Sequence, residues 1–86
     1  MIRGDIQKQT KKVLENLIAL LNLYSITLKN VVKTTVFLKD MNDFPEFNKI
    51  YSEYFKEEFP ARSCVEVAQL PKDVAVEIEA IAYFPD

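Results

Sequence analysis

The last third of the chain alternates between apolar and polar residues, and this pattern restricts the fold more than any other feature of the sequence. Alternation with a period of two is typical of β-strands that have one covered face. It predicts strands over residues 61–68 and 74–83, joined by a turn at residues 70–73. Because this connection is short, we expect the two strands to run antiparallel.

The alternation also sorts the side chains of these strands onto two faces. One face is apolar and holds Val65, Val67, Val74, Val76, Ile78, Ala80 and Ala82. The other face holds charged side chains and one thiol, from Arg62, Cys64, Glu66, Glu77 and Glu79. Since helices must cover the apolar face, we expect Arg62 and Glu77 to lie together on the face away from the helices. Such a face suits a small carboxylate-bearing molecule.

Three further segments precede these strands. Apolar residues recur every three or four positions over residues 6–24 and 43–55, which predicts two amphipathic helices. Between them, β-branched residues dominate residues 31–38 and predict a strand in which Val32 and Val36 share one face. The expected fold is therefore an α+β sheet of about three strands packed on two helices.

Composition excludes several kinds of site. The chain has 86 residues, so we expect one domain over residues 1–86. It has no histidine, one cysteine and one glycine, so it lacks the residues for a zinc site or a phosphate-cradling loop. We expect no metal and no cofactor. The net charge of −2, without a dense basic patch, argues against nucleic-acid binding.

The single cysteine and the apolar content bear on compartment and assembly. Cys64 cannot form an internal disulfide, which fits a reducing compartment, and we expect a cytoplasmic protein. No apolar run is long enough to cross a membrane. Hydrophobic residues make up 49% of the chain, which is more than one small core can hide. An oligomer, or a missing piece of the domain, would account for this excess.

Four residues are candidates for a functional site, and each has a structural alternative. Arg62 offers a planar fork of donors to a carboxylate, or an ion pair to Glu66 or Glu79. Glu77 is able to orient water or move a proton, although a strand glutamate is more often merely solvated. Cys64 is more often a small core residue than a nucleophile. Asn48, at the edge of the second helix's apolar face, requires a hydrogen-bond partner or a ligand.

Several stretches of the sequence resemble the RidA/YjgF family, whose members are also called endoribonuclease L-PSP and translation-inhibitor proteins. They are Asn30-Val31-Val32-Lys33-Thr34-Thr35-Val36-Phe37-Leu38-Lys39-Asp40-Met41-Asn42-Asp43-Phe44, Phe59-Pro60-Ala61-Arg62-Ser63-Cys64-Val65-Glu66-Val67-Ala68, Leu70-Pro71-Lys72-Asp73 and Val76-Glu77-Ile78-Glu79-Ala80-Ile81-Ala82. The resemblance covers nearly the whole chain. It implies a chorismate-mutase-like fold and a homotrimer with ligand clefts between subunits.

The resemblance also implies an activity and roles for the candidate residues. The activity is hydrolysis of 2-imino acids, such as 2-iminobutanoate and 2-iminopropanoate, to 2-keto acids and ammonia. Arg62 would hold the substrate carboxylate and Glu77 would serve the water or proton step. Cys64 and Asn48 would line the cleft. An imine is already activated toward water, so this chemistry needs neither a metal nor a strong nucleophile.

The sequence departs from the family at its N-terminus. Family members begin with strands that help to complete the cleft, whereas this chain starts at the first family helix. We therefore expect a truncated domain with a free sheet edge, or a compensating change of assembly. Two other functions stay open: a non-catalytic regulatory trimer that binds small carboxylates, and the endoribonuclease or translation-inhibitor role. The absence of histidine and the acidic balance argue against the last.

Overall fold

The computed structural model of the chain describes residues 6–56 and 59–85. Within these ranges, two α-helices and three strands follow one another in the predicted order. They are α1 (Ile6–Leu23), β1 (Val31–Leu38), α2 (Phe44–Tyr54), β2 (Ala61–Glu66) and β3 (Val76–Ala82). The predicted α+β class is confirmed, and the last two strands are each shorter than the alternation predicted.

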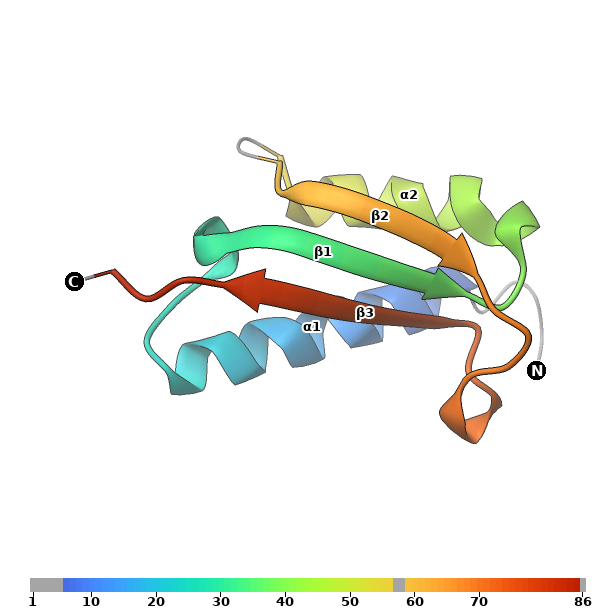
Figure 1. Ribbon diagram of the computed structural model, residues 1–86, viewed down its shortest axis with the longest axis horizontal. Helices are drawn as coiled ribbons and strands as arrows, with labels where there is room; N and C mark the ends of the chain where they lie inside the picture. Colours follow the sequence, from blue (N-terminus) through green and yellow to red (C-terminus); the bar gives the residue numbers. More distant parts are fainter. Residues whose placement is uncertain (1–5, 57–58, 86) are drawn as a thin grey trace.

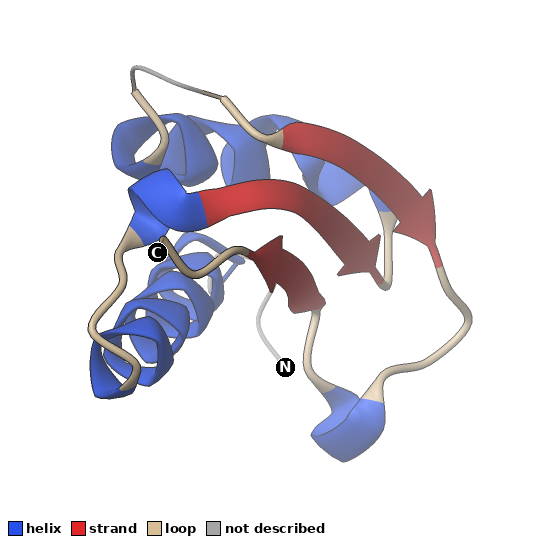
Figure 2. Ribbon diagram, turned by 60° about the vertical axis from the view of Figure 1, so that its left-hand side comes forward, coloured by secondary structure: helices blue, strands red, loops and turns tan. Residues whose placement is uncertain are grey.

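The elements form two layers. Both helices lie on one face of the sheet, and the other face is open (Figures 1 and 2). β1 is the central strand, with β2 parallel to it on one side and β3 antiparallel on the other. β2 and β3 therefore run in opposite directions, as their short connection predicted, but β1 lies between them and they do not pair.

The core lies between the helices and the sheet. Leu14 of α1, Phe47 of α2, and Val36 and Leu38 of β1 are completely enclosed, with 0% of each residue exposed. The amphipathic stripes of the two helices meet the sheet here, because burying them together removes the most apolar surface from water. None of the helices in the described residues is long and apolar enough to span a bilayer.

The central strand departs from simple alternation near its start. A register shift falls between Val31 and Lys33, where the pairing with β3 is irregular. An extra residue of this kind resets the alternation of side chains. Val31 and Thr34 are consequently buried on the helix side, whereas Val32 is 49% exposed. The prediction that Val32 shares a face with Val36 is wrong.

The face predicted for the functional side chains of β2 is also wrong. The register pairs Arg62 with Thr34 and Cys64 with Val36, and these β1 residues are buried against the helices. Residues directly opposite in a sheet share a face, so Arg62 and Cys64 lie on the helix side. Alternation shows which residues share a face, but it does not show which face is covered.

The predicted place of Glu77 is confirmed, because it pairs with Phe37 on the open face of the sheet. Val65 of β2 also pairs with Phe37 and is 42% exposed on that open face. The prediction that helices cover Val65 is therefore wrong. Arg62 and Glu77 of one chain therefore lie on opposite faces of the sheet. The prediction that they share a face is overturned by the register.

Residues 67–75 connect β2 to β3. This connection contains the 3₁₀ segment Pro71–Asp73, in which Lys72 and Asp73 have φ angles of 60° and 55°. Lys39 Nζ lies 2.6 Å from Asp73 Oδ1, an ion pair that ties this turn to the end of β1. Gln9 of α1 accepts a hydrogen bond from the N–H of Ala75 at 2.8 Å, so the turn is held from both layers.

Candidate functional site

A row of aromatic side chains on α2 forms the base of the candidate site. The ring centroids of Phe44 and Phe47 lie 6.1 Å apart, those of Phe47 and Tyr51 lie 5.4 Å apart, and those of Tyr51 and Phe55 lie 4.7 Å apart. Spacings of three and four residues bring these rings together along one side of a helix. The row lies next to β2, the edge strand of the sheet that runs alongside α2 (Figure 1).

Arg62 is held over this row. Its guanidinium carbon lies 4.8 Å from the ring centroid of Tyr51 and 5.2 Å from that of Phe44. Attraction between a cation and an aromatic face contributes about 0.5–1 kcal/mol at exposed positions. Two rings thus restrict where the guanidinium can lie, although Arg62 as a whole is exposed.

Asn48 fixes the orientation of the same group. Its Oδ1 accepts a hydrogen bond of 2.6 Å from a terminal nitrogen of Arg62. A guanidinium has five N–H donors, so this contact engages one and leaves others for a ligand. The structure places two of the predicted cleft residues, Asn48 and Arg62, in direct contact, and each is the other's partner.

Cys64 lies two residues after Arg62 on the same side of β2. The thiol is half-buried. Burial raises the pKa of the Cys64 thiol, and the nearby charge of Arg62 opposes that shift only in part. The thiol is therefore protonated at neutral pH, which suits a cleft-lining group better than a nucleophile.

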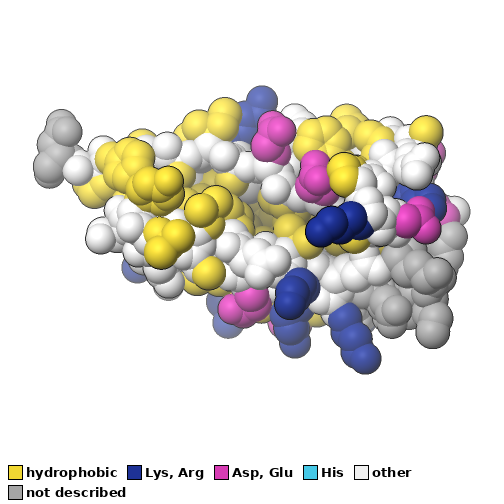
Figure 3. Space-filling view, turned by 90° about the horizontal axis from the view of Figure 1, so that it is seen from below, with side chains coloured by type: hydrophobic (Ala, Val, Ile, Leu, Met, Phe, Trp, Pro, Cys, Tyr) yellow, Lys and Arg dark blue, Asp and Glu magenta, His cyan; other side chains and the backbone are white. Residues whose placement is uncertain are grey.

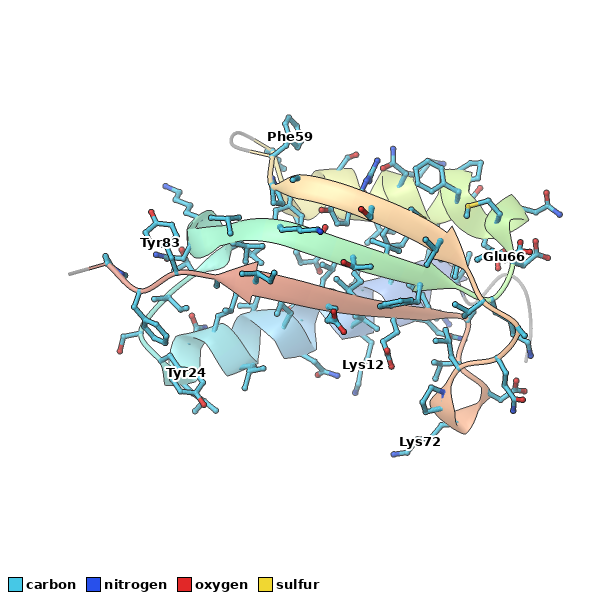
Figure 4. The ribbon with its side chains drawn as sticks, viewed as in Figure 1. Lys12, Tyr24, Phe59, Glu66, Lys72 and Tyr83 are labelled. Carbon is cyan, nitrogen blue, oxygen red and sulfur yellow. The ribbon has the colours of Figure 1, made fainter. Side chains whose placement is uncertain are left out.

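The acidic residues are placed away from the guanidinium. Glu66 lies at the end of β2, beside the start of α2, and its Oε1 accepts a hydrogen bond of 2.6 Å from the N–H of Met41 (Figure 4). Glu77 and Glu79 are exposed on the open face. The hydrogen bond that fixes Arg62 goes to Asn48, and none of the predicted acidic partners provides it.

Phe44 and Tyr51 also belong to the candidate site, because Arg62 lies over their rings, and the sequence analysis did not single them out. Their spacing from Asn48, four residues on one side and three on the other, was a usable signal. Residues at these separations lie on one side of a helix. The polar amide of Asn48 between two aromatic rings therefore indicates that this side of the helix is a binding surface and not only core. Among the described residues, no group of three or more histidine, cysteine, aspartate or glutamate side chains is arranged to hold a metal ion.

Comparisons with known proteins agree with this fold. The family profile described as Endoribonuclease L-PSP matches residues 1–84. A RutC family protein of Pyrococcus horikoshii is 57% identical over 83 residues, which are 96% of this chain and 66% of that protein. A Salmonella typhimurium protein named 2-iminobutanoate/2-iminopropanoate deaminase is 52% identical over 84 residues, covering 94% of this chain and 66% of its own length.

A solved structure gives the same result. Escherichia coli TdcF with bound serine superposes with a TM-score of 0.90 at 43% identity, over 94% of this chain and 66% of that one. The chain thus spans about two thirds of the length of the relatives that it matches. The profile covers nearly the whole sequence, and the relatives are identical to it at about half of the matched residues. The chain therefore belongs to the RidA/YjgF family, also described as Endoribonuclease L-PSP.

Proposed function

We propose that the protein hydrolyses 2-imino acids to 2-keto acids and ammonia. The observation that carries this proposal is the fixed guanidinium of Arg62, held by Asn48 at 2.6 Å and by the faces of Phe44 and Tyr51. The name of the Salmonella relative, 2-iminobutanoate/2-iminopropanoate deaminase, supplies the substrate class. Because Cys64 is unbridged, we place the reaction in a reducing compartment, the cytoplasm.

Arg62 would bind the carboxylate that all 2-imino acids carry. Two parallel N–H groups of a guanidinium match the two oxygens of a carboxylate. A guanidinium that is already oriented loses less conformational entropy when the ligand binds. The carboxylate would therefore be anchored, with its imine carbon at a fixed distance from the rings of α2.

The chemical step adds water to the imine carbon. One proton of the water moves to the imine nitrogen, which gives a carbinolamine. The hydroxyl proton of the carbinolamine then passes to the nitrogen, and ammonia leaves as the C–N bond breaks and the C=O bond forms. A carboxylate that orients the water and relays these protons would suffice. Among the candidates, we assign this role to Glu77.

Glu77 has to come from another copy of the chain, because it lies on the face of the sheet opposite to Arg62. The open face also exposes apolar side chains, including Val65 at 42%, Ile81 at 59% and Tyr83 at 53%. Packing against further copies would cover them. We therefore propose a homotrimer whose clefts combine Arg62, Asn48 and Cys64 of one chain with Glu77 of the next.

The test is a coupled assay in which 2-iminobutanoate is generated enzymatically and its conversion to 2-ketobutanoate is followed. The wild-type chain should accelerate the conversion, and Arg62→Ala should abolish the acceleration. Lys49→Ala is the matched control, since Lys49 is also cationic and lies next to Asn48 in α2 but is exposed and away from the rings. Equal rates for wild type and Arg62→Ala would reject the assigned site.

Mixing two inactive variants tests the shared cleft. Arg62→Ala and Glu77→Ala chains, refolded together in equal amounts, should regain about one quarter of the wild-type activity, because a quarter of neighbouring pairs combine an intact Arg62 with an intact Glu77. A mixture that stays as inactive as its components would contradict the assignment of Glu77 to the neighbouring chain.

A second candidate function is binding of small carboxylates without catalysis. It is favoured by the relative whose structure contains bound serine, an amino acid that has a carboxylate but no imine. The same assay separates the two functions. No acceleration, together with 2-ketobutanoate binding that Arg62→Ala removes, would favour the second one.

A further inference from the structure

Glu66 lies on the helix side of β2, as Arg62 does. The register pairs it with Leu38 of β1, which is 0% exposed beneath the helices. Its Oε1 accepts a hydrogen bond of 2.6 Å from the N–H of Met41, the first residue of the 3₁₀ segment Met41–Asp43 that leads into α2. A bond from a backbone N–H to a carboxylate is among the stronger hydrogen bonds. Glu66 therefore ties the end of β2 to the start of α2.

A short chain of contacts leads from this bond to the guanidinium of Arg62. The carbonyl of Met41 accepts a hydrogen bond from the N–H of Phe44. The ring of Phe44 lies under Arg62, with 5.2 Å between its centroid and the guanidinium carbon. The carboxylate of Glu66, the turn at Met41 and the ring of Phe44 thus form one continuous support for the cation.

The two hydrogen bonds between β2 and the α2 segment have matching spacings. β2 and α2 run side by side in opposite directions (Figure 1). Arg62 and Glu66 are about 13 Å apart along β2, at about 3.3 Å per residue. Their partners Asn48 and Met41 are about 12 Å apart along the helical backbone. Because these spans agree, both bonds form together, and they hold the first turns of α2 against β2 at two points.

We propose that Glu66 is a positioning residue of the carboxylate-binding site. It does not touch the ligand, but it holds the turn that carries Phe44 and so keeps the guanidinium of Arg62 oriented before a carboxylate binds. A side chain that is already oriented loses less conformational entropy on binding. This inference rests on the proposed role of Arg62 in binding the substrate carboxylate. It assigns to Glu66 a contribution to affinity and none to the chemical step.

The negative charge of Glu66 has an effect of the opposite sign. A carboxylate four residues from Arg62 weakly repels an anionic ligand, so removing the charge alone should tighten binding slightly. Loss of positioning should instead weaken binding. Glu66→Ala removes both the charge and the hydrogen bond. Glu66→Gln removes only the charge, because its amide oxygen still accepts the N–H of Met41.

The experiment measures KM and kcat for 2-iminobutanoate in the coupled assay, and Kd for 2-ketobutanoate. Glu66→Ala should raise KM and Kd about threefold to tenfold, the cost of ordering one long side chain during binding. Its kcat should stay within about twofold of wild type, since only uniform binding is lost. Glu66→Gln should bind as wild type does or slightly better. No increase of KM in Glu66→Ala, or equal increases in both variants, would overturn the proposal.

Two control variants exclude a general effect of surface charge. Basic side chains also gather on the side of the molecule that is seen from below (Figure 3). Lys12 points away from α1 on that side, and Lys12→Ala removes this exposed charge (Figure 4). Glu53→Ala removes an exposed carboxylate from α2 without touching its start. Both should leave Kd within about twofold of wild type. A loss of affinity in either control as large as in Glu66→Ala would contradict the proposal.

NMR of the ligand-free chain separates this inference from the proposed function. A wild-type chain that neither accelerates imine hydrolysis nor binds 2-ketobutanoate would refute the function. The positioning is then decided by the Hδ protons of Arg62, whose signals the aromatic rings should shift upfield in wild type and Glu66→Gln. Glu66→Ala should reduce this shift and speed hydrogen exchange at the amide of Met41. Unchanged Arg62 signals in Glu66→Ala would overturn the proposal, whatever the assay shows.

Discussion

The hydrogen bond between Thr34 and Tyr51 allows a quantitative test of how the sheet is joined to α2. The two hydroxyl oxygens are 2.8 Å apart, and the residues are 0% and 4% exposed. Tyr51→Phe keeps the ring that Arg62 stacks on but leaves the Thr34 hydroxyl buried without this partner. An unsatisfied buried hydroxyl costs about 1–3 kcal/mol. We expect the free energy of unfolding to fall by that amount.

The double variant separates the bond from its surroundings. Thr34→Val keeps the branched shape of the strand residue, and combined with Tyr51→Phe it removes both polar groups. The double variant should therefore lose less stability than the sum of the single changes, with a coupling energy of about 1 kcal/mol. Urea unfolding, monitored by circular dichroism, gives the free energy of unfolding of the wild type, the two single variants and the double variant.

Thermal unfolding provides a second readout. For a domain of this size, each 1 kcal/mol should lower Tm by roughly 4–8 °C. If the double variant loses as much stability as the two single variants together, the two hydroxyls do not depend on each other. That outcome would refute the pairing of β1 with α2 through this bond. The proposed deaminase activity should be nearly the same in Tyr51→Phe, because the ring under Arg62 remains.

Three further predictions follow from local geometry. The hydrogen bond from Tyr54 to Glu15 raises the pKa of Tyr54 to about 12, so its stabilising contribution is complete below pH ~10 and is lost as the pH rises toward 12. Tyrosinate absorbance should show this late ionisation, and Glu15→Gln should move it toward its ordinary pKa; no movement would disprove the link. Arg62→Ala should raise the pKa of Cys64 further and slow its alkylation by iodoacetamide at neutral pH, whereas faster alkylation would contradict their proximity. Lys72→Gly should raise the free energy of unfolding by up to about 1 kcal/mol, because glycine adopts a positive φ without strain, and a loss measured in urea would count against that reason.

The sequence predicted the order and type of the two α-helices and the three strands in the described residues, because each has a strong period. The two α-helices of the described residues begin and end within one residue of their predicted bounds. The strands β2 and β3 are shorter than predicted, since alternation continues past the last paired residue. Local patterns of hydrophobic residues therefore predict these helices and strands well.

The candidate site was predicted in part. Asn48, Arg62 and Cys64 come together, but Glu77 of the same chain does not join them. Alternation alone does not show which face of β2 the helices cover, because the charged side chain of Arg62 lies on the covered face, against aromatic rings. The stem of an arginine packs like an apolar side chain while its charged end stays accessible. Register, which depends on pairing distant in sequence, decides the face.

The central place of β1 has a consequence for how the chain folds as it is made. β1 is synthesised before both of its neighbours, and Val36 must wait for Cys64 and then for Ile78 to pair on its two sides. Pairings between residues so distant along the chain form late and slowly. While the ribosome still holds the last strand, α1, β1 and α2 expose the surfaces that β3 will cover. The sheet is therefore completed only after synthesis has passed β3, and a chaperone that shields β1 would act in that interval.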